Sequence, residues 1–179
     1  MSKPKSPRFP KFPFFPSAVL ALSIAFVSFF GGISYRNQQL AKETQRQEAN
    51  KFPSQAVITK VIDADTLEIQ DGRSLRLTAV NAPDAGPIAT PANEFTHQKL
   101  TDQTVTLEYE KNYEQDRFGR LNAYVFVNGT NHNLELVKNG LAEVVIYDKR
   151  RPWKYQEELL SAQDLARKQK LGIWSTLVK

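Results

Sequence analysis

The stretch that decides the fold covers residues 61–84 and reads VIDADTLEIQDGRSLRLTAVNAPD. It holds two β-type runs, 66–70 and 75–80, joined by the pair Asp71-Gly72, which is typical of a tight hairpin turn. Acidic and amide side chains stand near both ends of the stretch, with Arg76 between them. We therefore expect a β-hairpin that places oxygen ligands for a hard cation beside a cationic group for a phosphate.

Further short strands and three helices are predicted on both sides of the hairpin. Outside it, we expect strands over 56–62, 104–109 and 121–127, and helices over 91–101, 133–139 and 155–170. Five short strands with inserted and appended helices fit a small closed barrel better than a parallel sheet. The predicted fold class is therefore mainly β with helices (α+β), a five-stranded OB-type β-barrel with about three helices, covering residues 55–175.

The N-terminal residues have three successive compositions. Residues 1–16 hold five prolines and four cations, which predicts a basic tail without a helix. Residues 17–35 belong to a run of 24 uncharged residues, long enough for a transmembrane helix, which needs roughly 20 apolar residues. Residues 36–54 are polar and form either a helical stalk or a flexible linker.

Two readings of residues 17–35 remain open, an uncleaved transmembrane anchor and a cleaved signal segment. Cations precede the apolar run, which places the N-terminus in the cytoplasm and the domain outside it. The residues after the run, 31–35, make a poor cleavage site, which favours the anchor over a secreted product. The chain has no cysteine, so its core alone must hold an exported domain.

The charge of the chain is unevenly placed. Its formal net charge is +5, and residues 1–50, with seven basic residues and two glutamates, carry all of it. The remaining residues are balanced between basic and acidic side chains. General basicity therefore gives no reason to expect that the globular part binds polyanions, and phosphate binding there requires individually placed arginines.

Four segments, in order, resemble the staphylococcal nuclease-like (thermonuclease) family. They are DADT at 63–66, RLTAVNAPD at 76–84, DRFGRLNAYV at 116–125, and NLELVKNGLA at 133–142 with a closing ARK to GIW at 166–174. The resemblance covers about residues 55–175. It implies an OB-fold, a monomer, and a calcium-dependent endo/exonuclease. It also implies substrates of DNA and RNA, preferably single-stranded or denatured, cut at the 5′ P–O bond to leave 3′-phosphates.

Three residues are candidates for holding Ca²⁺. Asp65 follows a strand and offers a carboxylate, which suits a hard cation, although an aspartate here also suits a plain turn. By the resemblance, Asn81 stands where the family usually has a second aspartate, so the affinity for calcium should fall, and Ala82 offers its backbone carbonyl. Asp63 and Thr66 are expected to fix the turn and to orient Asp65.

Three further residues are candidates for binding and cleaving the phosphate. Arg76 lies on a core-forming strand, where a cation needs a partner, and its planar fork can hold either a phosphate or a rim carboxylate. By the resemblance, Arg120 is the second phosphate ligand and Asp84 the base that activates water. The family usually has glutamate at the position of Asp84. Aspartate is one methylene shorter, so its carboxylate reaches less far toward the attacking water.

Some candidates rest on weaker signals. Tyr147 can stack on a base at the edge of the site or pack against the domain, and Tyr113 and Tyr155 are less certain candidates for the same role. His97 and His132 are expected on helix surfaces. Ala64 stands where the family prefers glycine, which costs about 1 kcal/mol if the position needs a left-handed backbone.

Three functions are compatible with these residues. The first is the membrane-tethered nuclease. The second is an OB-type module that binds nucleic acid or protein and has lost catalysis, which the changes at Asn81 and Asp84 favour. The third is a passive surface anchor. The joint presence of Asp65, Arg76, Arg120 and a carboxylate at Asp84 favours the enzyme, because a binding-only module has no reason to keep all four. A passive anchor gains nothing from the pair of arginines.

Overall fold

The computed structural model describes residues 18–175, without the side chains of 18–31 and 48–50. Its contacts divide the chain into two units, residues 1–48 and 49–179, and each is described by itself. The predicted tail, residues 1–16, lies outside the described residues.

A single helix, α1 (Ala18–Lys51), contains most of the N-terminal segment. Residues 36–51 belong to this helix, and the division of the N-terminal segment into tail, span and linker stays a prediction. A search of the described residues for a helix long and apolar enough to cross a membrane finds none. The side chains of residues 18–31, which make up most of the predicted span, are outside the part of the chain that the structure describes. The transmembrane anchor therefore stays a prediction.

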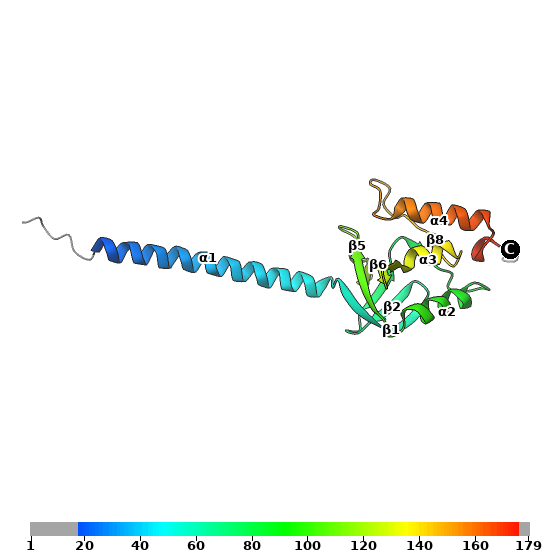
Figure 1. The fold of residues 1–179 in the computed structure, drawn as a ribbon, viewed down its shortest axis with the longest axis horizontal. Helices are drawn as coiled ribbons and strands as arrows, with labels where there is room; N and C mark the ends of the chain where they lie inside the picture. The colour runs from blue at the N-terminus through cyan, green and yellow to red at the C-terminus, as the bar shows by residue number, and fades with distance from the viewer. Residues whose placement is uncertain (1–17, 176–179) are drawn as a thin grey trace, which may run out of the picture. The chain divides into compact units, whose positions relative to one another are not determined.

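Six strands form one sheet, in the order β3-β2-β1-β5-β6-β7 (Figure 1). Their bounds are β1 (Gln55–Asp63), β2 (Thr66–Ile69), β3 (Ser74–Leu77), β5 (Thr104–Tyr109), β6 (Leu121–Val127) and β7 (Thr130–Asn131). Neighbours in this order are antiparallel, and β3 also pairs in parallel with β6 through Leu75 and Leu121. This pairing closes five strands into a barrel without an open edge, as predicted for an OB-type fold.

Two short strands and three helices complete the domain. They are β4 (Val80–Asn81), paired with β8 (Glu143–Val144), and the helices α2 (Ala89–Leu100), α3 (His132–Lys138) and α4 (Gln156–Lys168), with a 3₁₀ turn η1 (Gly172–Trp174). Helices α3 and α4 pack side by side, and α2 packs against β1 and meets the start of α3 (Figure 1).

The barrel interior is filled by alternate side chains of the strands. In β3, Leu75 and Leu77 are buried while Ser74 and Arg76 are half-buried, the pattern of a strand with one face in the core. Tyr124 of β6 is the bulkiest fully buried side chain. Each large apolar side chain in this core contributes roughly 1.5–3 kcal/mol by leaving water.

The third predicted strand, 75–80, is shorter than expected. β3 ends at Leu77 because Ala79 adopts a left-handed backbone conformation, with φ 62°. The chain therefore turns, and Val80 and Asn81 continue as β4 against β8. The strain expected at Ala64 is absent, because that residue does not have a positive φ, whereas Ala79 carries a cost of roughly 1–2 kcal/mol.

The C-terminal segment is fixed to α3 by two glycines in backbone contact. Gly140 and Gly172 have φ values of 64° and 47°, and the amide of Ile173 donates to the carbonyl of Gly140 at 2.9 Å. A Cβ atom on Gly140 would lie 2.4 Å from the carbonyl oxygen of Leu171. Only glycine permits such a close contact between the two backbone segments. The turn after α3 therefore packs directly against the turn after α4.

Candidate active site

Asp65 is the buried centre of the candidate site. It lies in the turn between β1 and β2 and is 2% exposed. One carboxylate oxygen, Oδ1, accepts from Thr66 Oγ1 at 3.2 Å and pairs with the Arg76 guanidinium, and Oδ2 accepts from the amide of Ala82 at 2.6 Å. A carboxylate this deep needs such partners, and the three contacts fix its orientation.

Arg76 connects Asp65 to Asn81. Its side chain is 14% exposed, and it donates through Nη2 to Asn81 Oδ1 at 2.9 Å and through Nη1 to the carbonyl of Asp65 at 3.1 Å. The turn at Ala79 explains how Asn81, five residues later, comes within reach. Arg76 therefore has the carboxylate partner that its position on a core strand requires.

The turn before Asp65 is supported from both sides. The amide of Asp65 donates to Asp63 Oδ1 at 3.1 Å, the contact of an Asx turn. From the other side, the Thr96 hydroxyl donates to the carbonyl of Ala64 at 3.0 Å and lies 3.0 Å from His132 Nε2. The expected surface position of His132 is therefore wrong, because this side chain is 2% exposed and supports the turn through Thr96.

Arg120 is positioned by its own turn. Asp116 Oδ2 accepts from Arg120 Nε at 2.7 Å, and Asp116 Oδ1 accepts from the amide of Arg120 at 3.0 Å. Gly119 permits the tight turn with φ 82°, and the exposed ring of Phe118 lies 5.5 Å from the Arg120 guanidinium. The planar fork of Arg120 is thereby held at one edge.

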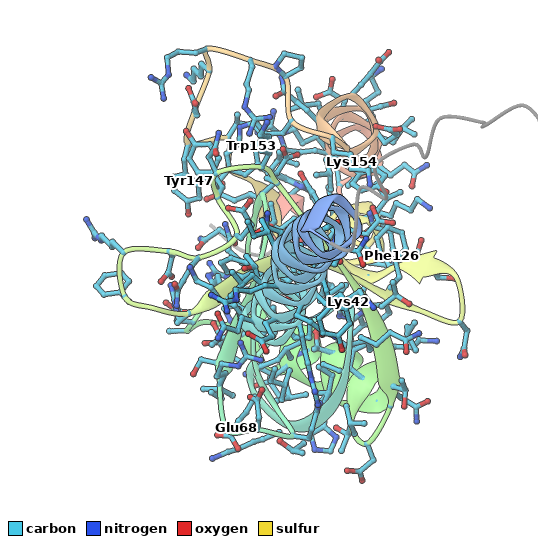
Figure 2. All side chains as sticks on the ribbon, turned by 90° about the vertical axis from the view of Figure 1, so that its left-hand side faces the viewer. Lys42, Glu68, Phe126, Tyr147, Trp153 and Lys154 are labelled. Carbon is cyan, nitrogen blue, oxygen red and sulfur yellow. The ribbon has the colours of Figure 1, made fainter. Side chains whose placement is uncertain are left out.

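Arg76 and Arg120 line one cavity of about 510 Å³, here called the arginine pocket. Its other lining residues are Leu77, Tyr113, Gln115, Asp116, Arg117, Phe118, Asn122, Tyr147 and Trp153. Tyr147 and Trp153 lie close together on one side of the domain, with ring centroids 6.4 Å apart (Figure 2). The pocket thus combines two arginines with several aromatic faces, the combination that binds phosphates and bases.

The electrostatics of Arg76 connect the pocket to the other candidates. Burial lowers the pKa of Arg76 from its ordinary value, and the positive charge of Arg120 lowers it further. Tyr147, Asp63 and Asp84 act in the opposite direction. The two guanidinium cations repel each other across the pocket, so an anion between them would relieve that repulsion.

Asp84 and Tyr155 differ in how the structure places them. Asp84 is exposed and follows β4, near enough for its charge to act on Arg76. Tyr155 is not in the arginine pocket: its ring packs edge-on against Tyr124 at 4.8 Å and its hydroxyl donates to Glu108 at 2.6 Å. Tyr155 is therefore a packing residue, while Tyr113 and Tyr147 line the pocket.

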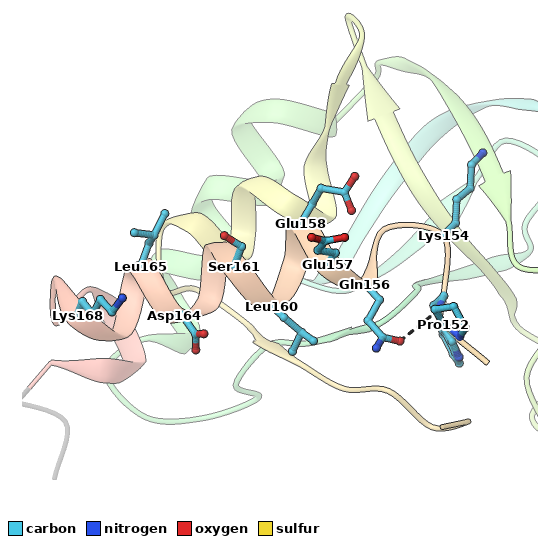
Figure 3. Close-up of a pocket in the computed structure, with 11 residues that line it drawn as sticks. Pro152, Lys154, Gln156, Glu157, Glu158, Leu160, Ser161, Asp164, Leu165 and Lys168 are labelled. Carbon is cyan, nitrogen blue, oxygen red and sulfur yellow. Dashed lines mark hydrogen bonds between the residues drawn. The ribbon is translucent and has the colours of Figure 1, made fainter. Parts of the chain in front are cut away.

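A second cavity, of about 760 Å³, follows the outer face of α4 (Figure 3). Its lining mixes acidic groups such as Glu157 and Asp164 with Leu160 and Leu165. None of the candidate site residues contributes to it, and it has no arginine. The side chains that suit phosphate binding therefore line the arginine pocket and not this larger cavity.

The comparisons with known proteins agree with this geometry. The family model described as Staphylococcal nuclease homologue matches residues 35–176. The chain belongs to this family. It is 36% identical to a thermonuclease of Staphylococcus hyicus, over 89% of this chain and 92% of the relative. It is also 26% identical to Endonuclease YncB of Bacillus subtilis (strain 168), over 77% of this chain and 76% of the relative.

The calcium that the staphylococcal nuclease family implies can be tested against the oxygens present. Asp65 Oδ1 contacts Nη1 and Asn81 Oδ1 contacts Nη2 of the Arg76 guanidinium, so Arg76 occupies both oxygens in this structure. Calcium takes six to eight oxygen ligands. Among the described residues, no group of three acidic or histidine side chains is placed to hold a metal ion. The carboxylate and amide oxygens are of the type that calcium prefers. Together, however, they carry only one negative charge, and both already contact Arg76.

Several pocket residues were missed by sequence reasoning. Asp116 fixes Arg120, and Phe118, 70% exposed, stands at the rim beside Arg117. Trp153 is buried beneath Tyr113, with ring centroids 5.4 Å apart. Asp116 and Phe118 belong to the segment already singled out at 116–125, so that signal was available, whereas nothing local marks Trp153.

Proposed function

We propose that the domain is an endo/exonuclease that hydrolyses phosphodiester bonds of DNA and RNA, with a preference for single-stranded or denatured substrate. The observation that carries the proposal is that Arg76 and Arg120 line the same pocket. Attack on phosphorus develops negative charge on the equatorial oxygens, which two preorganised guanidinium groups stabilise. The names of the relatives, a thermonuclease and an endonuclease, support the same reaction class.

The reaction begins with the phosphate held between Arg76 and Arg120. Asp84 accepts a proton from water as the water oxygen bonds to phosphorus. The bond from phosphorus to the 5′ oxygen breaks, and that oxygen leaves as a hydroxyl after taking up a proton, so a 3′-phosphate remains. The charge of Asp84 acts on Arg76, which supports its place beside the phosphate.

We also propose that the activity depends on calcium. Asp65, Asn81 and the carbonyl of Ala82 would hold the ion, which when bound supplies positive charge beside the phosphate. The convergence of Asp65 and Asn81 on the Arg76 guanidinium supports this assignment. With a single carboxylate among these ligands, the affinity for calcium should be low, and Arg76 must give up part of its contact when calcium binds.

The test is cleavage of denatured DNA by the full chain, in calcium or in EGTA, with Arg120→Ala as the variant. The loss of one such donor should lower kcat/KM by roughly 10²–10³. Arg73→Ala is the matched control, because Arg73 likewise pairs with an aspartate, Asp71, at 2.6 Å, but lines no part of the pocket. Equal loss in both variants would contradict a role for Arg120 in the reaction.

The competing function is an OB-type module that binds nucleic acid or protein without cleaving it, which the changes at Asn81 and Asp84 favour. Retained binding of single-stranded DNA with no cleavage at millimolar calcium would establish the binding module in place of the enzyme. Cleavage that yields 3′-phosphate ends, seen by end labelling, would support the enzyme and the bond assigned to it.

We propose further that residues 17–35 anchor a monomeric domain outside the cytoplasm. The run of 24 uncharged residues, with cations before it, supports this location. Extraction of the full chain from cell membranes by detergent and not by high salt would agree with an anchor. Recovery of a shortened chain from the medium would indicate a cleaved signal segment instead.

A further inference from the structure

The segment 148–154, here called the basic loop, is fastened to Tyr113 beside the arginine pocket. The Tyr113 hydroxyl donates to Asp148 Oδ2 at 2.5 Å. The indole nitrogen of Trp153 donates to the carbonyl of Asp148 at 3.0 Å, and the Arg151 guanidinium lies over the Tyr113 ring at 5.6 Å. The loop therefore has a defined position relative to the pocket that Tyr113 and Trp153 line.

A buried carboxylate holds the other end of the basic loop. Glu110 is 4% exposed and accepts from Arg151 Nη1 at 3.1 Å, from Tyr124 Oη at 3.2 Å and from the amide of Lys154. Arg151 Nη2 also donates to the carbonyl of Lys111 at 2.7 Å. Because a buried carboxylate needs such donors, these hydrogen bonds to Glu110 fix the basic loop to the barrel.

The basic loop concentrates positive charge in a domain whose basic and acidic residues balance as a whole. Lys149, Arg150 and Arg151 are consecutive, and Asp148 is the one acidic residue among residues 148–154. Arg150 is held as a fork, with Nε and Nη2 donating to Asp148 at 2.9 and 3.0 Å. Its side chain is 86% exposed, and none of the hydrogen bonds found among the described residues uses its Nη1.

Tyr113 joins this charge to the candidate active site. It lines the arginine pocket and also a neighbouring cavity of about 450 Å³, whose other lining residues are Asn112, Asp148, Arg150 and Arg151. A strand with one phosphate between Arg76 and Arg120 would pass Tyr113 and present a further phosphate to Arg150. A substrate with a single phosphate can use only one of the two places.

We propose that Arg150, with Arg151, forms a second phosphate subsite that binds a flanking phosphate of a single-stranded DNA or RNA substrate. The proposal rests on the proposed function, because it assumes that the reacting phosphate lies in the arginine pocket. Its consequence is a preference for polynucleotides over short substrates. Arg150 is fixed by Asp148 and Tyr113, so little side-chain freedom is lost when the phosphate binds.

The test compares Arg150→Gln with wild type on a dinucleotide and on a single-stranded twelve-nucleotide DNA. We expect kcat/KM to fall about tenfold on the longer substrate and to stay unchanged on the dinucleotide. Arg73→Gln is the control, because Arg73 also donates through Nε and Nη2 to an aspartate two residues earlier, Asp71, and is not among the residues that line the pocket. An equal fall on both substrates would overturn the subsite.

Binding of the same DNA in EGTA, measured by fluorescence anisotropy, separates this proposal from the proposed function. Arg150→Gln should weaken binding about tenfold and reduce the slope of log K against log salt by about 0.7, the value for one phosphate contact on a single strand. Unchanged affinity and slope would overturn the subsite even in an active nuclease. A protein that cleaves nothing but shows these changes would keep the subsite and lose the nuclease.

Discussion

The buried imidazole of His132 makes the stability of this domain depend on pH. The single hydroxyl proton of Thr96 goes to the carbonyl of Ala64, so its oxygen can only accept from His132, whose Nε2 therefore carries a proton. Burial lowers the pKa of His132 from 6.5 to about 4, while Glu135 opposes this shift and Lys99 adds to it. In the unfolded chain the same ring titrates near its ordinary pKa.

The magnitude follows from these two values. Between pH 6.5 and about 4, His132 binds a proton in the unfolded chain but not in the folded domain. The free energy of unfolding therefore falls as the pH falls through this window. At pH 5 the loss from this one group is about 2 kcal/mol relative to pH 7.5. Above about pH 7.5 the group contributes almost no pH dependence. Because Thr96 also supports the turn that carries Asp65, the acid effect should reach the candidate site.

The assay is urea unfolding of wild type and His132→Gln at pH 7.5 and pH 5. Glutamine keeps an N–H donor for Thr96 and does not titrate, so the variant should lose about 2 kcal/mol less than wild type between the two conditions. The comparison concerns the change with pH and not the absolute stability, which cancels any packing defect of the variant. The same pH dependence in both proteins would refute a buried, neutral His132.

Three further substitutions test the site and the fold. Asn81→Asp adds a second charged oxygen beside Asp65 and should raise calcium affinity by about tenfold or more, measured by isothermal titration calorimetry; unchanged affinity would remove Asn81 from the calcium ligands. Asp84→Glu lengthens the proposed base and should raise kcat on denatured DNA with little change in calcium affinity, whereas an unchanged kcat would argue against its role. Gly140→Ala brings Cβ to 2.4 Å from the Leu171 carbonyl and should cost about 2–4 kcal/mol in thermal or urea unfolding. Gly129→Ala is its control: it has φ 77° but nothing within 4 Å, so it should cost about 1 kcal/mol, and equal losses would show that the contact with Leu171 is unimportant.

Local pattern was sufficient for most of the barrel. Strands formed where β-branched and alternating residues predicted them, and Asp71-Gly72 made its turn with a left-handed glycine, φ 83°. These features depend on neighbours in the chain, which a sequence displays directly. The end of β3 was predicted wrongly because the left-handed turn occurs at Ala79, a residue type that gives no warning of it.

The sequence by itself singled out the candidates for the phosphate chemistry, since Arg76, Arg120 and Asp65 stand in recognisable segments. Only the tertiary structure decided what surrounds them. Closure of β3 against β6 brings Arg120 beside Arg76 from 44 residues away, and burial turns His132 from an expected surface group into a support of the active turn. Contacts between distant segments depend on barrel closure and burial, and no local sequence pattern indicates them. The contacts of Arg76 and those that hold the basic loop could therefore be found only in the folded molecule.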